Sequence, residues 1–394
     1  MKILYLSSLC SVKEYQNMFQ KSGTTSSHAA QKFNRLIVNG LIENGAEVEC
    51  LTKRTFYNIQ ESVLDWETEI ENTINYTYLP FYKKNLKNRL LAIKNTYKFL
   101  RRWAKKYPDG VLICDILSGE LSIAIWLASR INKIKRIALV MDVPCIRAEN
   151  KRKGIKKFLA WVKNSLIYSY SGYIFLTHQM NDVLNKKNRP YAIVEGIADD
   201  SSGCGETTVS FSEKGKTIMM AGLLDPIFGV DLLLDAFQMI EDEQARLKLY
   251  GKGSSVERIV ELSKIDERIQ YGGELLNNEI IEEEKKALLL INPRTPAGKW
   301  TAYSFPSKNM EYMASGTPLV AFDLPCIPNE YKEYFYQLKE PTASSVCAVL
   351  EELLKKDAQE LADFGDRASK WIKTSKSPKI QTKKIIELIE TLRS

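Results

Sequence analysis

Along most of its length the sequence alternates short apolar runs with longer segments in which apolar residues recur at helical spacing. The runs are too short for helices, and the segments between them are amphipathic, as at 28–43, which ends at Asn44-Gly45. This alternation is typical of a parallel sheet covered by helices. It predicts an α/β fold of the doubly wound, Rossmann-like type, in which ligands bind beyond the carboxyl ends of the strands.

The alternation occurs twice, and a polar, glycine-containing stretch near 199–215 separates the two halves. Strands are predicted at 3–6, 47–51, 111–114, 136–141, 173–176 and 191–194, and then at 217–220, 247–250, 269–271, 287–291 and 319–322. Helices of the second half are predicted at 229–240, 254–264, 277–286 and 306–315, followed by 342–355, 358–373 and 379–392. We expect an N-terminal domain at 1–200, a linker at 201–215, a C-terminal domain at 216–372 and a helix at 373–394 that could cross back to the N-terminal domain.

Composition excludes several classes of protein. With 394 residues, 44% of them hydrophobic and 26% charged, the chain can bury a sizeable core. The seven cysteines form no CxxC pair, and there are only two histidines, so we expect reduced thiols and no histidine-rich metal site. No apolar run reaches the ~18 residues of a membrane span. The apolar run at the start of the sequence is too short for the hydrophobic region of a secretion signal. We therefore expect a cytoplasmic protein.

Positive charge is concentrated in two segments of the first half. Residues 81–110 carry ten Lys or Arg against one acid, Asp109, and residues 147–168 carry seven against one, Glu149. Both segments also hold apolar residues at helical spacing. They are either two solvated helix faces or a peripheral contact with an anionic membrane surface at the inner face of the cell membrane. No nucleic-acid-binding motif accompanies the charge, so nucleic acid is not an expected partner.

One segment of the second half combines features that bind anions. Residues 287–322 read as a strand, a polar loop, a short helix and a second strand, and Ser304 is the predicted N-cap of the helix. The unbonded N–H groups of a helix start attract anions, and Lys308 lies within the first turn. A cation at this end of the helix is unfavourable because of the helix dipole, so its presence indicates a bound anion. The alternative is a solvated surface lysine.

Glu311 follows on a nearby face of the same predicted helix. A carboxylate can accept hydrogen bonds from two adjacent hydroxyl groups, which suits a ribose. The alternative is an ion pair with Lys308 one turn away.

These residues lie in a longer pattern that resembles family 4 glycosyltransferases, which are retaining enzymes of the GT-B fold. The similar elements are MAGLLDPIFGVDLLLDAF at 220–237, LYGKG at 249–253, NPR at 292–294 and SFPSKNMEYMASGTP at 304–318. The resemblance covers about 216–325 well and the first half only in outline. It implies two Rossmann-like domains facing across a cleft, a nucleotide diphosphate sugar bound to the C-terminal domain and an acceptor bound to the N-terminal one.

The sequence departs from this family at two places. Tyr303 replaces the first glutamate of a Glu-x7-Glu motif, and Leu223 and Phe228 stand where an arginine and a lysine usually hold the diphosphate. We expect other cations to replace them, namely Arg294, Lys299 and Lys308, and we assign catalytic roles to Lys308 and Arg294. The residues predicted to bind the donor are Glu311, Tyr303, Ser304, Phe305, Pro306, Ser307, Gly222, Gly251, Lys299 and Gly196.

In the first half, the candidates follow predicted strands. Asp142 follows the strand at 136–141 and is suited to orient an acceptor hydroxyl, which makes it the third predicted catalytic residue; a role as a loop or cap residue is the alternative. His178 follows the next strand and could simply begin a helix. Gly23 lies in a loop of small residues that would let the backbone approach a phosphate or an acceptor.

The sequence therefore predicts a retaining glycosyltransferase that moves a sugar from a nucleotide diphosphate donor to a glycan or lipid-linked glycan, as in the synthesis of bacterial surface polysaccharide. It contains no Asp-x-Asp motif, so neither a bridging metal nor a cofactor is expected. The alternative is a non-catalytic, glycosyltransferase-like binding subunit, which the two departures would explain. A nicotinamide-dependent dehydrogenase ranks far below, because no G-x-G-x-x-G follows the first strand. The sequence leaves open the nucleotide, the sugar and the acceptor.

Overall fold

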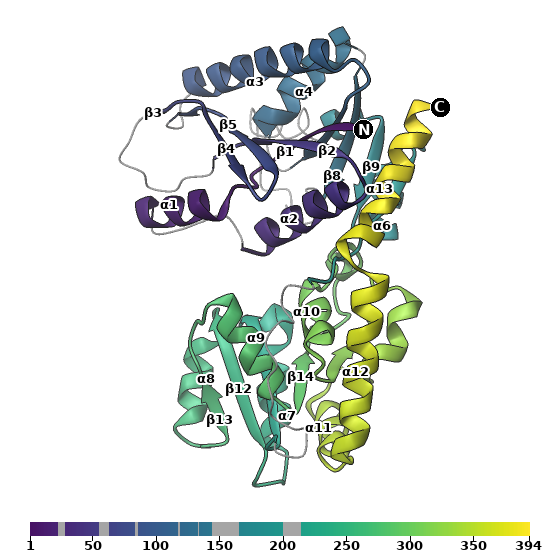
Figure 1. Ribbon diagram of the computed structural model, residues 1–394. Helices are drawn as coiled ribbons and strands as arrows, with labels where there is room; N and C mark the ends of the chain where they lie inside the picture. Colours follow the sequence, from purple (N-terminus) through teal and green to yellow (C-terminus); the bar gives the residue numbers. More distant parts are fainter. Residues whose placement is uncertain are drawn as a thin grey trace. The chain divides into compact units, whose positions relative to one another are not determined.

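The computed structural model describes residues 1–22, 28–54, 63–82, 86–116, 119–132, 134–143, 165–199 and 214–394. Contacts divide the chain into two compact units (Figure 1). Unit 1 comprises Met1–Ile197 and Pro378–Ser394, and unit 2 comprises Ala198–Ser377. The last helix of the chain therefore belongs to unit 1, together with the first half of the sequence.

Unit 1 is built on an eight-stranded sheet with the order β10-β9-β8-β7-β1-β2-β5-β4. Its strands are β1 (Lys2–Ser7), β2 (Glu47–Thr52), β4 (Glu67–Glu71), β5 (Ile74–Tyr78), β7 (Val111–Asp115), β8 (Lys135–Val140), β9 (Gly172–Phe175) and β10 (Tyr191–Ile193). Only β4 is antiparallel to its neighbour. The inner strands are buried along nearly their whole length, as expected for parallel strands covered on both faces. All six strands predicted for this half are present.

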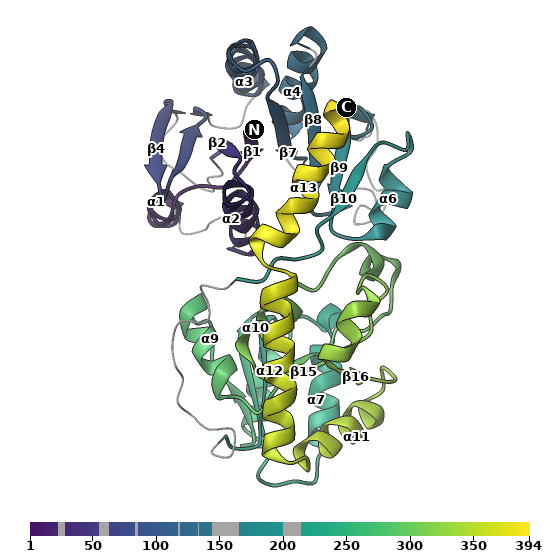
Figure 2. The ribbon, with the colours of Figure 1, turned by 45° about the vertical axis from the view of Figure 1, so that its right-hand side comes forward.

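Helices cover both faces of this sheet. They are α1 (Val12–Ser22), α2 (His28–Glu43), α3 (Leu86–Lys106), α4 (Gly119–Asn132), α6 (His178–Leu184) and α13 (Pro378–Arg393). Helices α3 and α4 pack on each other on one face, and α2 and α13 pack on each other on the opposite face (Figure 2). The core between α2, α13 and the sheet contains Ile37, Leu41, Ile385 and Ile389, all fully buried.

The hairpin formed by β4 and β5 is absent from the sequence prediction. Strand β4 reads Glu-Thr-Glu-Ile-Glu, and its one apolar residue, Ile70, is 74% exposed. This strand therefore lacks the apolar run by which the other strands are recognised. The hairpin turn places Asn72 and Thr73 in the left-handed region, with φ of 47° and 71°. A second, two-stranded pair, β3 (Val63–Leu64) with β6 (Phe81–Tyr82), lies near it in sequence.

Unit 2 contains a six-stranded, wholly parallel sheet with the order β13-β12-β11-β14-β15-β16. Its strands are β11 (Thr217–Leu223), β12 (Arg246–Lys252), β13 (Ile269–Tyr271), β14 (Leu289–Asn292), β15 (Leu319–Phe322) and β16 (Tyr336–Leu338). Its α-helices are α7 (Val230–Gln238), α8 (Val256–Ser263), α9 (Asn277–Lys286), α10 (Ser307–Ser315), α11 (Ala343–Leu354) and α12 (Ala358–Ser375). The edge strand β16 is short and absent from the sequence prediction.

The structure bears on the predicted domain boundary, the linker, the second basic segment and the expectation of no membrane span. The boundary expected at 372 falls inside α12, and the chain leaves unit 2 at Ser377. Most of the expected linker 201–215, and most of the basic segment 147–168, lie outside the described residues. Within the described part of the chain, no helix combines the length and the apolar character that a membrane crossing requires.

Candidate functional site

At the carboxyl ends of strands β11 and β12 in unit 2, two glycines leave the backbone bare. Gly222 and Gly251 are paired in register and have φ of 138° and 127°, which other residues rarely adopt. A Cβ at Gly251 would lie 1.9 Å from the carbonyl oxygen of Gly222. Both positions therefore require glycine, and a ligand can approach the strand ends closely.

Helix α10 is fixed to the ends of strands β11 and β14 by two side chains. The Tyr312 hydroxyl accepts a bond from the backbone N–H of Ala221 at 2.7 Å and donates to its carbonyl at 3.1 Å. Asn292, at the end of β14, donates from Nδ2 to Oδ1 of Asn309 at 2.6 Å. Because the helix is fixed at two points, its first turn is held beside Gly222. The Cε atom of Lys308 lies 4.0 Å from where a Cβ of Gly222 would stand.

Lys308 lies between two carboxylates. Its ammonium contacts Oε1 of Glu311 on α10 and lies 3.5 Å from Oε1 of Glu284 on α9. The Glu284 side chain is completely buried, whereas 32% of the Lys308 side chain is exposed. The ion pair that the sequence offered as the alternative role of Glu311 is therefore present, and part of the Lys308 side chain still reaches solvent.

The ionisation of this cluster follows from its burial. Burial and the nearby Glu311 raise the pKa of Glu284 to about 8, against the opposing effect of Lys308. Burial alone would lower the pKa of Lys308, but Glu311 and Glu284 together raise it above its ordinary value. This environment favours the protonated form of Glu284 and the charged form of Lys308. The ammonium faces a single carboxylate charge, and a further anion meets less repulsion.

The prediction that Ser304 caps the helix is wrong. A short 3-10 helix, η4 (Lys299–Tyr303), precedes it, and Ser304 follows in an extended conformation with φ of −139°. Helix α10 begins at Ser307 with Pro306 in the capping position, where no side chain caps the helix. The carbonyl of Ser304 accepts a bond from Sγ of Cys326 at 3.5 Å. The first N–H groups of α10 are consequently not bonded to a capping side chain.

Arg294 lies in a cluster with two aromatic residues, Trp300 and Phe228. It is buried at the end of β14, and its guanidinium lies 4.1 Å from the ring centre of Trp300. Phe228 meets the same ring edge-on, at 6.1 Å. Phe228, at the position where the resembling family carries a cation, thus packs against the ring of Trp300. Arg294 lies on the same ring. This arrangement also fits a loop-organising role for Arg294, and its contact with a diphosphate stays a prediction.

The other residues predicted to bind the donor lie in the same loop. Lys299 and Ser307 are exposed, Tyr303 is half-buried and Pro306 is buried. The ring of Phe305 is buried edge-on against Tyr331, at 5.6 Å, so only its backbone can face a ligand.

In unit 1, the candidates Asp142 and His178 follow the neighbouring strands β8 and β9 and so lie at one edge of the sheet. Oδ1 of Asp142 accepts a bond from the backbone N–H of Val143 at 2.9 Å. His178 is exposed and is the first residue of α6, which matches its alternative role as a helix start. Gly23 lies outside the described residues.

The turn that contains Gly196 is held by α13. The carbonyl of Gly196 accepts a bond from Nε2 of Gln381 at 2.8 Å, and the buried carboxylate of Glu195 lies 3.5 Å from the ammonium of Lys384. This turn therefore has a structural partner within unit 1, and a contact with the donor stays a prediction.

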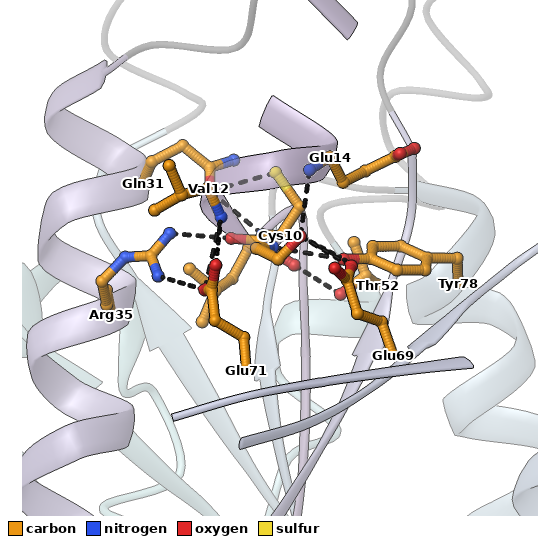
Figure 3. Close-up of polar contacts among 11 residues, drawn as sticks. Cys10, Val12, Glu14, Gln31, Arg35, Thr52, Glu69, Glu71 and Tyr78 are labelled. Atoms are coloured by element: carbon orange, nitrogen blue, oxygen red, sulfur yellow. Dashed lines mark hydrogen bonds and ion pairs between the residues drawn. The ribbon is translucent and has the colours of Figure 1, made fainter. Parts of the chain in front are cut away.

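A polar network fixes the loop after β1 (Figure 3). Gln31 on α2 donates to the carbonyl of Ser8 at 2.6 Å and accepts from the N–H of Cys10 at 3.1 Å. Arg35, one turn further along α2, donates to the carbonyl of Cys10 at 2.8 Å and to Glu71 at 3.0 Å. Helix α2 thereby fixes this loop to the hairpin that the sequence prediction missed.

The hairpin also fixes the start of α1. Glu71 accepts from the N–H of Val12 at 2.9 Å, and Glu69 accepts from Ser11 Oγ at 2.6 Å and from Tyr78 Oη at 2.9 Å (Figure 3). Carboxylates at a helix start are favourable because of the helix dipole. The glutamates of β4 therefore fix the start of α1 at this edge of the unit 1 sheet.

Sequence reasoning missed three residues of the unit 2 site, namely Glu284, Asn309 and Tyr312. One signal was available for Glu284, because it shares a helical face with Ile280 and Ile281, and all three are buried. A charged residue on an apolar helix face needs a partner. No local signal indicates that this partner is Lys308, because the two residues are on different helices.

Comparison with known proteins gives a match to this part of the chain. Residues 215–355, which contain Gly222, Glu284 and Lys308, match a family model described as glycosyl transferases group 1. The match lies within unit 2. Among curated proteins, none matched the sequence.

Solved structures extend the similarity to the whole chain. Sucrose-phosphate synthase from Thermosynechococcus elongatus is 13% identical with a TM-score of 0.71, over 100% of this chain and 99% of that chain. HepE of Anabaena in complex with UDP is 13% identical with a TM-score of 0.65, over 99% and 100%. A TarM mutant of S. aureus in complex with fondaparinux, α-GlcNAc-glycerol and UDP is 12% identical with a TM-score of 0.65, over 99% and 100%. The chain has the GT-B fold, and the segment that resembles the glycosyl transferases group 1 model lies in the C-terminal of its two Rossmann-like domains.

Proposed function

We propose that this protein is a retaining glycosyltransferase of family 4, which transfers a sugar from a nucleotide diphosphate to a glycan. The observation that carries the proposal is the position of Lys308, whose side chain is 32% exposed and lies beside Gly222 at the start of α10. A helix start and a cation beside bare backbone form a site for a diphosphate. The similar structures of HepE and TarM contain UDP, which supports a nucleotide at this fold.

The proposed reaction depends on electrostatic stabilisation. The bond between the sugar and the β-phosphate oxygen breaks while the acceptor oxygen bonds to the same carbon on the same face. The departing phosphate oxygen takes the acceptor proton. Negative charge grows on the diphosphate, and Lys308, Arg294 and the N–H groups of α10 stabilise it. In this mechanism no metal or cofactor is required, in keeping with the lack of an Asp-x-Asp motif.

Donor recognition falls to the residues around α10. Glu311 accepts hydrogen bonds from the ribose hydroxyls, while its contact with Lys308 holds both side chains in place. Tyr303 donates a hydrogen bond to the sugar in place of the usual glutamate. Lys299, exposed in the same loop, adds positive charge near the phosphates.

The acceptor lies on unit 1 in this proposal. Asp142 orients its hydroxyl, and His178 and the loop that contains Gly23 are the further proposed contacts of the acceptor. The acceptor is a lipid-linked glycan of bacterial surface polysaccharide, and the segments 81–110 and 147–168 contact the anionic inner face of the membrane. On the described helix α3, Lys94, Lys98, Arg101, Arg102 and Lys105 are exposed.

Replacing Lys308 tests the proposal. The Lys308→Ala variant should lose about two orders of magnitude in kcat/KM with its donor, because the charge of the departing diphosphate is no longer stabilised. Donor hydrolysis, measured over a panel of UDP- and GDP-sugars, first identifies the donor.

Two controls separate this effect from misfolding. Lys370→Ala removes an exposed lysine of α12 and should leave kcat/KM unchanged. Because Lys308→Ala leaves Glu284 buried without its ammonium partner, the double variant Lys308→Ala/Glu284→Gln keeps the fold while the cation is absent. Near-normal turnover in the folded double variant would overturn the proposal.

A non-catalytic binding subunit is the second candidate. It is favoured by Phe228, which packs on Trp300 where the resembling family has a cation. A thermal-shift panel of UDP, GDP and ADP separates the two, because a nucleotide that binds the native state raises Tm. A rise in Tm with one of the nucleotides would favour the enzyme, and no rise with any of the three would favour the subunit.

A further inference from the structure

A half-open pocket of about 340 Å³ lies on the surface of unit 1, between the middle of α3 and the residue that precedes β4. Its lining consists of Trp66, Asn95, Lys98, Phe99 and Arg102. The volume is at the lower end of the range of small-ligand pockets. None of these residues belongs to the donor site in unit 2 or to the strand ends of unit 1 assigned above.

The pocket has an aromatic floor. Trp66 and Phe99 are stacked, with ring centres 5.7 Å apart and planes 20° apart. Trp66 is nevertheless 41% exposed, which is high for so large an apolar side chain. An open aromatic face attracts the slightly positive C–H groups of a sugar ring, because the π face carries negative charge.

Two cations lie beside this floor. Lys98 and Arg102 are one turn apart on α3, and both are exposed. In the described chain neither forms an ion pair, and α3 contains no acidic residue at all. Like charges at this spacing repel each other and slightly destabilise a helix. A ligand with a negative group between the two cations would remove this repulsion.

From this combination we infer that the pocket binds a negatively charged sugar residue of a glycan, whose ring packs on Trp66 and whose carboxylate or phosphate lies between Lys98 and Arg102. Asn95 lines the same pocket. Within the pocket a lipid fits less well, because Trp66 lies flat against Phe99 and does not project as a membrane-inserting side chain would. The membrane contact proposed for 81–110 then falls to the other exposed cations of α3, Lys94, Arg101 and Lys105. The inference goes beyond the proposed function, since binding here requires neither a donor nor transfer.

The direct test is binding of acidic sugars to the full-length chain without nucleotide. The probes are tetragalacturonate and glucose 6-phosphate, with maltotetraose and glucose as neutral counterparts, followed by calorimetry. We expect an acidic probe to bind at least tenfold more tightly than its neutral counterpart. Trp66→Ala and Lys98→Ala/Arg102→Ala should each weaken that binding tenfold or more, and Trp66→Phe should retain most of it.

The matched control is Arg101→Ala/Lys105→Ala, which removes the same charge from the same helix at exposed positions outside the pocket. This variant should bind the acidic probe like the unaltered chain. Equal weakening in both double variants would overturn the inference in favour of non-specific attraction. Failure of both acidic probes to bind would also overturn the inference, and so would binding to anionic phospholipid vesicles without binding to either acidic probe. The donor-hydrolysis rate reports on the proposed function separately, because the Trp66 variants leave the unit 2 site unchanged.

Discussion

At the residue scale, the site depends on how one ammonium is shared. Lys308 contacts Glu311 and Glu284, and burial keeps Glu284 protonated at neutral pH. A buried, charged Glu284 would compete with a diphosphate for Lys308. The protonated form avoids this competition and still accepts a bond from the ammonium.

This ionisation predicts a pH dependence of stability. The pKa of Glu284 is raised from the ordinary 4.5 to about 8 in the folded chain, so between these values the native state holds a proton that the unfolded state lacks. The stability of unit 2 should therefore fall as pH rises from about 5 to about 8, by up to about 1 kcal/mol per pH unit from this group. Denaturant unfolding at several pH values measures it.

The Glu284→Gln variant should lose this dependence, because glutamine does not titrate. Glu282→Gln, on the same helix but half-exposed, serves as the control and should keep it. An unchanged pH profile in Glu284→Gln would show that Glu284 does not carry the extra proton.

At the element scale, the sequence predicts what depends on local pattern. Helix α2 at 28–43 and strand β13 at 269–271 match their predicted ranges, because amphipathic spacing and short apolar runs are local properties. Strand β4 was missed because its glutamates are satisfied by distant residues such as Arg35. The helix cap at Ser304 was misplaced because η4 delays the start of α10.

For the candidate site too, the sequence predicted the residues that lie in one local pattern and missed those that act through tertiary contacts. The pattern around Lys308 and Glu311 lies within one helix, so the sequence placed both residues correctly on α10. Glu284 and Tyr312 act through tertiary contacts with Lys308 and Ala221, which no local pattern encodes. The stack of Arg294 on Trp300 likewise depends on how a loop folds.

At the scale of the whole molecule, the end of the chain completes the core of its beginning. Helix α13 belongs to unit 1, where Ile385, Leu388 and Ile389 are buried with residues of α2 and the sheet. Gly40 on α2 allows this packing, because a Cβ there would lie 2.3 Å from the carbonyl oxygen of Pro378. The stability of unit 1 thus depends on residues that follow unit 2 in the sequence.

This dependence predicts which unit a change in the last helix affects. Ile385→Ala should destabilise unit 1 by about 2–5 kcal/mol, because it leaves a cavity in a fully buried core. Lys383→Ala, at an exposed position of the same helix, should have little effect. Hydrogen exchange resolves the two units. Faster exchange confined to unit 2 in Ile385→Ala would contradict the assignment.

The central claim, that the start of α10 and Lys308 receive the diphosphate, is tested most directly by a crystal structure of the chain with the nucleoside diphosphate that raises Tm. We predict phosphate oxygens bonded to the backbone N–H groups of Ser307 and Lys308 and within 4 Å of the Lys308 ammonium, roughly the distance at which paired charges interact strongly. Phosphates bound elsewhere, with Lys308 still held by Glu311 and Glu284, would contradict the account.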